Sequence, residues 1–142
     1  MTITPKAPYD SGSLLKALCV WREARSEIHL AKVGVVWVLM NRVRMSPAQG
    51  FARTIAAEIL RPWQFSSFNE GDPNCDLYPD ENDPSWQDSL DAAEAPGLVD
   101  PTNGAVFYFS RPLTEPPGAW GDTIVTARIG HLTFCGLAER VT

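Results

Sequence analysis

The chain has 142 residues, of which 44% are hydrophobic and 20% are charged, and its formal net charge is −5. This length fits one globular domain, and this composition excludes a disordered or collagen-like chain. The longest apolar run, residues 33–40, is too short to span a bilayer, so we expect no stable insertion into a membrane.

The distribution of charged residues and the number of cysteines narrow the possible classes of protein further. Residues 63–142 carry 13 of the 17 acidic residues, whereas residues 1–62 are net basic. The basic half could contact an anionic polymer, but both halves could equally present only solvated charges. Because the acidic half has no basic stripe, we expect no nucleic-acid partner. The three cysteines are an odd, sparse set, which is no disulfide framework and indicates a reducing compartment.

The first residues have the composition of a flexible tail. Residues 1–12 contain Pro5, Pro8 and an Asp-Ser-Gly cluster, all of which interrupt regular structure. They include no apolar core and no cleavage site of a secretory signal. We therefore expect synthesis in the cytoplasm without an export signal, and a single domain over residues 13–142.

Apolar spacing predicts four helices. The first covers residues 13–25 and the second residues 30–45. The second is apolar on nearly every side, so its period does not exclude a buried strand, but its length and polar end favour a central core helix. Shorter helices are predicted over residues 54–60 and, after an Asp-Pro start signal, over residues 85–95.

The rest of the chain predicts loops and a late sheet. Residues 63–84 form an irregular acidic segment, and long loops in compact domains are usually functional. Residues 105–110 alternate like a strand, and residues 123–134 indicate a hairpin that turns near Ile129-Gly130. The predicted fold class is therefore α+β, mostly helical, with a small antiparallel sheet near the C-terminus.

The end of the first helix carries two carboxylates. In steps of four, Leu15, Cys19, Glu23 and Glu27 follow one helical face. Apolar neighbours and a like charge one turn away both favour the protonated carboxyl, which is how a general acid is made. The alternative, which spacing alone favours, is a pair of surface glutamates with the neighbouring arginines as solvated partners.

Several motifs occur in order between Leu14 and Phe134: EARSE at 23–27 with VGVVWVLMNR at 33–42, QFS at 64–66, NEGDPN at 69–74, DPTNGAVFY at 100–108 and VTARIGHLTF at 125–134. In order and spacing they resemble the SleB-type cell wall hydrolases, which are the spore cortex-lytic enzymes and their bacterial and phage relatives. The family has Gly and Pro in the turn after the first motif, where this chain has Ser26 and Ile28. The geometry around Glu27 is therefore less predictable than that around Glu23.

The resemblance implies a lysozyme-like fold and cleavage of the peptidoglycan glycan strand between N-acetylmuramic acid and N-acetylglucosamine. It further implies that Glu23 is the single acid/base of a lytic transglycosylase; attack by water instead would make the chain a hydrolytic muramidase. A phage or prophage endolysin, released through a holin or carried in a virion, fits a small chain without an export signal. The alternative from another class is a non-catalytic peptidoglycan-binding or virion structural module.

The predicted substrate-binding residues lie outside the first helix, apart from Glu27. Amide, hydroxyl and aromatic groups in residues 63–66 can hold or stack on a sugar, although they could equally anchor a loop. Tyr108 could orient the substrate or Glu23, or it could be a core tyrosine with a satisfied hydroxyl. The predicted set is Gln64, Phe65, Ser66, Tyr108, Glu27 and Thr126.

No metal or cofactor site is predicted. The acidic residues of 72–83 depart from a calcium loop, because Leu77 stands where that loop requires Gly and two prolines intrude. The two histidines have no partners at zinc-ligand spacing. We therefore expect no cofactor, a monomer, and peptidoglycan as the partner.

Overall fold

The computed structural model describes residues 11–62 and 64–138. In this part of the chain the helices are α1 (Ser11–Ala24), α2 (His29–Met45), α3 (Ile55–Leu60) and α4 (Pro84–Glu94). The strands are β1 (Phe107–Phe109), β2 (Thr123–Ile129) and β3 (Leu132–Leu137). Short 3-10 helices are η1 (Ala48–Gly50), η2 (Ser66–Phe68), η3 (Pro73–Asp76) and η4 (Gly118–Trp120). The predicted fold class is confirmed.

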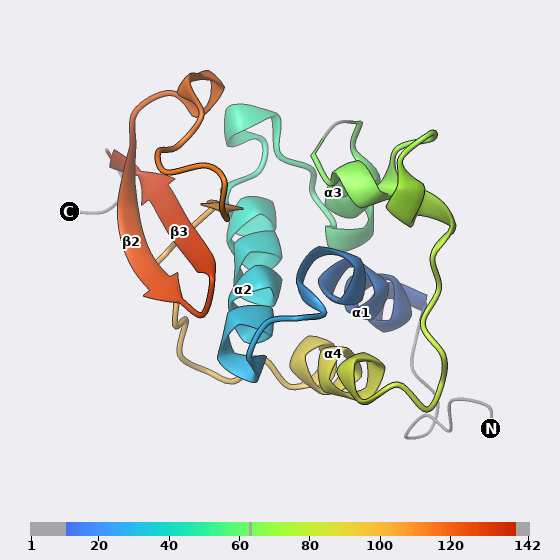
Figure 1. Cartoon of the computed structure of the whole chain (residues 1–142). Coiled ribbons are helices and arrows are strands. Elements are labelled where there is room, and N and C mark those ends of the chain that lie inside the picture. Colours follow the sequence, from blue (N-terminus) through green and yellow to red (C-terminus); the bar gives the residue numbers. More distant parts are fainter. Residues whose placement is uncertain (1–10, 63, 139–142) are drawn as a thin grey trace.

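The three strands form one antiparallel sheet in the order β1-β3-β2. Tyr108 in β1 lies opposite Phe134 in β3, and the register of β2 against β3 shifts at a bulge between Val125 and Ala127. The predicted hairpin is present, and it turns at Gly130-His131, one residue later than predicted. Figure 1 shows α2 between this sheet and the other helices, so α2 is the wall shared by both halves of the fold.

The interior of the protein is built on α2. Val35, Val36, Val38 and Leu39 are fully buried, which explains why the helix is apolar on nearly every side. Gly34 allows the sheet to approach closely, since a Cβ atom at this position would lie 2.6 Å from Cζ of Phe134. The prediction of a central core helix is confirmed, and a strand is excluded for this segment.

α1 is shorter than predicted, and the turn that follows it contains no helix breaker. α1 ends at Ala24, one residue before the predicted end, and the Glu27 N–H donates to the Ala24 carbonyl at 2.9 Å. Ile28 is extended and precedes α2, so the turn is made without glycine or proline. Glu27 is therefore outside the helix, and the helical spacing does not apply to the Glu23–Glu27 pair.

Side-chain caps set the starts of the two shorter helices. Thr54 Oγ1 accepts from the Ala57 N–H before α3, and Asp83 Oδ1 accepts from the Ser85 N–H before α4.

The predicted boundary of the N-terminal tail falls inside α1, which begins at Ser11, while residues 1–10 lie outside the described residues. The three cysteines are free. Among the described helices, none is long and apolar enough to cross a membrane.

Candidate active site

The carboxyl group of Glu23 lies at the end of α1 and is held by two hydroxyl groups. The Tyr108 hydroxyl donates to Oε1 at 2.9 Å, and the Ser67 hydroxyl donates to Oε2 at 2.8 Å. Glu23 itself is partly exposed. Both partners are neutral, and a hydroxyl can accept as well as donate. The carboxyl group can therefore be held in either protonation state.

Tyr108 reaches Glu23 from the middle of β1. Its ring packs against Phe134 of the neighbouring strand, with 6.0 Å between the ring centroids. Burial raises the pKa of the Tyr108 phenol well above its ordinary value, and the charge of Glu23 acts in the same direction. The phenol therefore keeps its proton and remains available as a donor. Of the two predicted roles for Tyr108, the structure shows the contact with Glu23.

Ser67 is positioned by Arg22, the residue before Glu23. The buried Arg22 guanidinium donates to the Ser67 carbonyl at 3.2 Å, to Cys75 at 2.9 Å and to Leu77 at 3.1 Å. These bonds fasten the irregular segment over residues 67–77 to α1. Arg22 is therefore a positioning residue, and the alternative of solvated arginines is wrong for this side chain.

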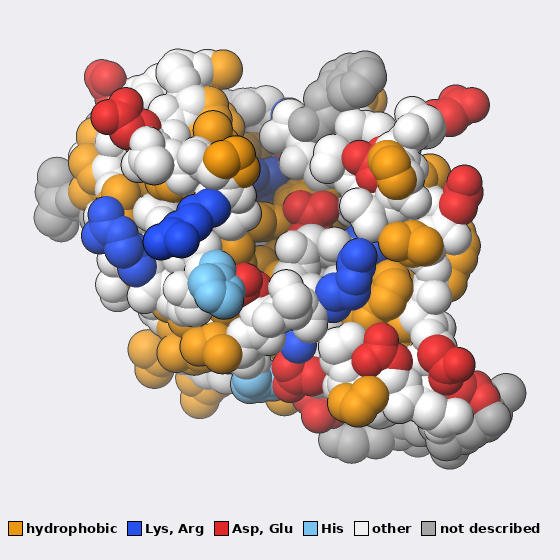
Figure 2. Space-filling view, in the orientation of Figure 1, with side chains coloured by type: hydrophobic (Ala, Val, Ile, Leu, Met, Phe, Trp, Pro, Cys, Tyr) orange, Lys and Arg blue, Asp and Glu red, His pale blue; other side chains and the backbone are white. Residues whose placement is uncertain are grey.

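Glu23 opens into a cleft of about 440 Å³, which is within the usual range for ligand sites. Figure 2 shows that this face of the molecule is hollowed between the sheet side and the helical side, with acidic atoms visible in the hollow. Among the described residues that line the cleft, Glu23 is the only acidic one. The other lining residues are Arg42, Gln49, Phe51, Arg61, Gln64, Phe65, Phe107, Tyr108, Ala119 and Trp120.

One wall of the cleft contains a buried ionic cluster. Glu58 is fully buried and accepts from Arg42 at 3.0 Å, from Arg61 at 2.9 Å and from the Ala52 N–H at 2.9 Å. Burial alone would raise the pKa of Glu58, but the hydrogen bonds from Arg61, Ala52 and Arg42 and the charge of Arg42 outweigh it, and the pKa is lowered. The carboxylate of Glu58 thus offsets one of the two arginine charges, and the cluster has a net charge of +1.

The residues predicted after α3 divide between the cleft and the core. Gln64 lines the cleft and is partly exposed. Phe65 also lines it but is only 2% exposed, and it packs in the cluster of Cys19, Leu39 and Ile59. Ser66 is exposed and is absent from the described lining, and its neighbour Ser67 makes the contact with Glu23. Trp63, predicted as a stacking residue, lies outside the described residues.

Glu27 and Thr126 lie elsewhere. Glu27 Oε1 accepts from the His131 N–H at 2.8 Å and its Oε2 lies 3.1 Å from the His131 ring, so the carboxylate secures the β2–β3 turn. Thr126 is at the bulge of β2, where its carbonyl accepts from Asn103 at 3.1 Å. Neither residue lines the Glu23 cleft in the described part of the chain.

The DPTNGA motif has a structural role. Asp100 accepts from the Thr102 N–H at 2.7 Å, from the Gly104 N–H at 2.9 Å and from the Asn41 amide at 2.9 Å. Asn41 also donates to the Ala105 carbonyl. Burial opposes ionisation of Asp100, but hydrogen bonds from Thr102 and Asn41 and from the backbone lower its pKa. The motif thus ties α2 to the start of β1, which carries Tyr108.

Several residues of the cleft were not predicted as site residues. Ser67 and Arg22 flank predicted positions, and Trp120 could have been found as the aromatic residue of a Pro/Gly-rich loop. The Trp120 ring stacks on Phe107 with 4.6 Å between centroids and an angle of 6°. No sequence signal distinguishes Gln49, which lines the cleft from η1 with a left-handed backbone (φ 60°). No group of three or more residues suited to hold a metal ion occurs among residues 11–62 and 64–138.

Comparison with known proteins gives consistent matches. The sequence model of a family described as Cell Wall Hydrolase matches residues 26–135, a range that begins three residues after Glu23. The spore cortex-lytic enzyme of Bacillus subtilis strain 168 is 31% identical over 121 residues, which is 85% of this chain and 36% of that protein. The chain thus spans about a third of the length of this curated relative.

Two solved structures have a similar fold. The catalytic domain of the Bacillus cereus SleB protein aligns with a TM-score of 0.63 and 29% identity over 95% of this chain and 97% of that domain. The catalytic domain of the germination-specific lytic transglycosylase SleB from Bacillus anthracis gives a TM-score of 0.62 and 29% identity, covering 89% and 96%. The fold and the matched motifs agree, and the chain belongs to the cell wall hydrolase family that includes SleB.

Proposed function

We propose that this protein cleaves the glycan strand of peptidoglycan between N-acetylmuramic acid and N-acetylglucosamine, with Glu23 as the acid and then the base. The observation that carries the proposal is a partly exposed carboxyl group in a cleft, held on both oxygens by neutral hydroxyl groups. Such a group can give up a proton and take one back without losing its position.

The proposed reaction has two steps. Protonated Glu23 donates its proton to the glycosidic oxygen as the bond from that oxygen to C1 of the muramyl residue breaks. The electron deficiency at C1 is stabilised by the N-acetyl group of the same sugar. Glu23, now a carboxylate, takes the proton of the C6 hydroxyl as the C6 oxygen bonds to C1, which leaves a 1,6-anhydromuramyl end.

The arrangement of carboxylates supports the use of one glutamate. Retaining and inverting glycosidases usually place a second carboxyl group across the scissile bond. Among the described residues that line the cleft, Glu23 is the only acidic one. Both oxygens of Glu27 are engaged by His131. A relative of similar fold is described as a lytic transglycosylase. A hydrolytic muramidase, in which water attacks C1, is the second outcome of the same site.

Glu23→Gln is the direct test, because it keeps the shape of the side chain and removes the ionisable proton. We expect release of soluble fragments from purified peptidoglycan to fall by at least about a hundredfold, the usual minimum for loss of a general acid. The thermal unfolding midpoint should stay nearly unchanged. The control is Glu70→Gln, an exposed position outside the cleft lining, which should retain wild-type release. Activity above a hundredth of wild type in Glu23→Gln would refute the assignment.

Mass spectrometry of the released fragments separates the remaining alternatives. Fragments one water lighter than lysozyme products indicate the transglycosylase, and ordinary reducing ends indicate the muramidase. Binding of wild-type protein to peptidoglycan without release would favour a non-catalytic binding or structural module. The endolysin role, with release through a holin or from a virion, stays a prediction, as do the monomeric state and the site of synthesis.

A further inference from the structure

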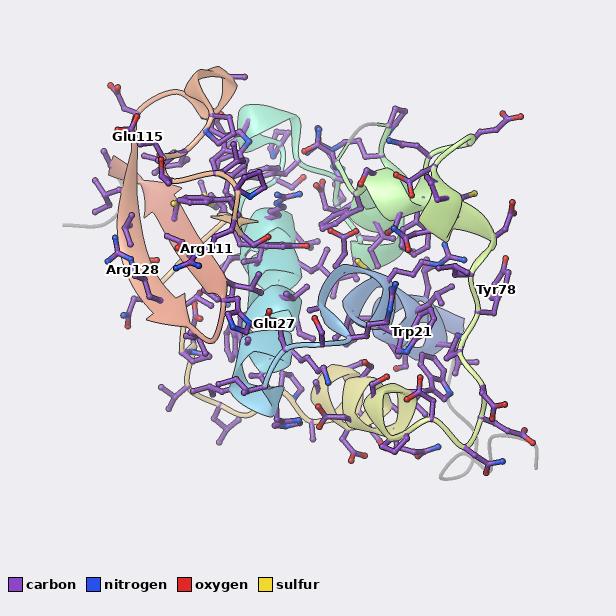
Figure 3. All side chains as sticks on the ribbon, in the orientation of Figure 1. Trp21, Glu27, Tyr78, Arg111, Glu115 and Arg128 are labelled. Carbon is purple, nitrogen blue, oxygen red and sulfur yellow. The ribbon has the colours of Figure 1, made fainter. Side chains whose placement is uncertain are left out.

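A second groove lies beside the Glu23 cleft and is used by no step of the proposed reaction. It has a volume of about 650 Å³ and is lined by the end of β1, the residues that follow it, and the β2–β3 hairpin. Two arginines, Arg111 and Arg128, contribute to the lining. Figure 3 places both on the sheet side, with Glu27 between the sheet and α1. We call it the arginine groove.

The arginine groove carries two exposed positive charges. Arg111 and Arg128 are exposed, and neither makes an ion pair within residues 11–62 and 64–138. The carboxylate in the same lining, Glu27, has both oxygens engaged by His131. Two unpaired cations therefore face one groove in the half of the chain that carries 13 of the 17 acidic residues.

The groove adjoins the cleft along β1. Phe107 and Tyr108 line the cleft, and the next residue, Phe109, lines the arginine groove. The α1–α2 connection makes the same link, since Glu23 lies in the cleft and Glu27 in the groove. The lining of the cleft and the lining of the groove are therefore neighbours along both segments.

The chemistry of two arginines selects an anionic group. The guanidinium fork matches carboxylate and phosphate oxygens through paired hydrogen bonds. A long phosphate polymer would need an extended basic stripe and would be repelled by a protein of net charge −5. One or two separate carboxylates fit a two-arginine groove better. The peptide stem, which is joined by an amide bond to the lactyl group of muramic acid, carries such carboxylates on its amino acids.

We propose that Arg111 and Arg128 bind the free carboxylates of the peptide stem on the muramyl residue next to Glu23. This subsite rests on the proposed function, since it assumes a glycan strand in the cleft. It would make the protein select strands that carry acidic stems over bare or amidated ones.

Binding tests the subsite without turnover. In a Glu23→Gln background, we would measure by calorimetry the affinity for a disaccharide tetrapeptide from peptidoglycan and for the same compound with its stem carboxylates amidated. Adding Arg111→Gln and Arg128→Gln together should weaken binding of the acidic stem by about tenfold or more, the loss expected for two charge-assisted hydrogen bonds. Binding of the amidated stem should change by less than about twofold.

The matched control removes the same charge elsewhere. Arg44 and Arg53 are exposed and line neither the cleft nor the arginine groove. The variant with Arg44→Gln and Arg53→Gln should bind both compounds as the background does. Equal losses for the acidic and amidated stems, or no loss for either, would overturn the subsite. Arginine-dependent binding of a glycerol phosphate polymer, with no dependence on the stem, would assign the groove to phosphate instead.

Turnover distinguishes failure of the subsite from failure of the proposed function. The ratio of cleavage rates for stem-bearing strands and for strands stripped by an amidase should fall about tenfold in the double variant with an otherwise wild-type cleft. If wild-type protein cleaves neither substrate, the proposed function fails while the binding experiment still decides on the groove. If it cleaves both and the ratio is unchanged, the function stands and the subsite is wrong.

Discussion

Two glutamates at the cleft have opposite surroundings: Glu23 lines it, whereas Glu58 is buried behind the lining residues Arg42 and Arg61. Glu58 in α3 is fully buried and bonded to two guanidinium groups and one backbone N–H. Glu23 in α1 is partly exposed and is bonded to two neutral hydroxyl groups. Two cations hold Glu58 in its ionised form, whereas both hydrogen-bond partners of Glu23 are neutral.

The comparison indicates how the fold separates stability from chemistry. The Glu58 cluster joins α2, α3 and the loop at Ala52. Arg42 also donates to the Val106 carbonyl at 2.7 Å, which ties the residue before β1 to the same cluster. The cluster forms one wall of the cleft through Arg42 and Arg61. Glu23 has no cation among its own hydrogen-bond partners.

The largest expected effect comes from breaking the Glu58 cluster. Glu58→Gln leaves the buried Arg42 without its counter-charge, and removing one partner of a buried pair costs about 3–5 kcal/mol. The free energy of unfolding should fall by that amount in urea denaturation. Glu70→Gln, at an exposed position, should change it by less than about 0.5 kcal/mol. Equal stability of the two variants would show that the wall does not depend on the ion pairs.

The elements of the fold were largely predictable, and the contacts of the site were not. Apolar spacing defines α2, and local capping signals define α3 and α4, since these depend on neighbouring residues. Glu23 was identified through a family resemblance. Its partners are 44 and 85 residues away, so local pattern carries no information on them.

Two errors have identifiable physical causes. The choice of Ser66 over Ser67 is a one-residue error in η2, where a 3-10 turn directs adjacent side chains differently. The second error concerns Arg22, which was considered as a solvated partner of the glutamates. Nothing in the sequence around an arginine next to a catalytic candidate indicates that its side chain is buried. Its three carbonyl acceptors belong to an irregular segment whose path cannot be derived from periodicity.

Acid should destabilise the protein, because it protonates carboxylates that the folded state holds in their ionised form; we call these the locked carboxylates. Glu58, Asp88 and Asp100 all have pKa values lowered in the folded state. Groups of this kind stabilise the fold fully above their unfolded pKa values of about 3.9–4.3, and that contribution is lost as the pH falls through the lower folded values. The urea midpoint should therefore be level from about pH 7 to 5 and fall below about pH 4.

The pH dependence of the urea midpoint, measured on Glu58→Gln, sharpens the comparison of the two glutamates. The variant lacks one of the three locked carboxylates, so its midpoint should start lower at pH 7 and fall less steeply in acid. An unchanged acid response in Glu58→Gln would contradict the role given to Glu58.

The smallest expected effects come from the hydroxyl groups that hold Glu23. Tyr108→Phe and Ser67→Ala each remove one hydrogen bond, whose net worth is about 0.5–1.5 kcal/mol, so each should lower kcat about threefold to tenfold with little change in KM. Tyr78→Phe, at an exposed tyrosine outside the cleft lining, is the control and should leave kcat and KM unchanged. A rise in KM with kcat unchanged would mean that these hydroxyl groups act in substrate binding and do not hold the carboxyl group of Glu23.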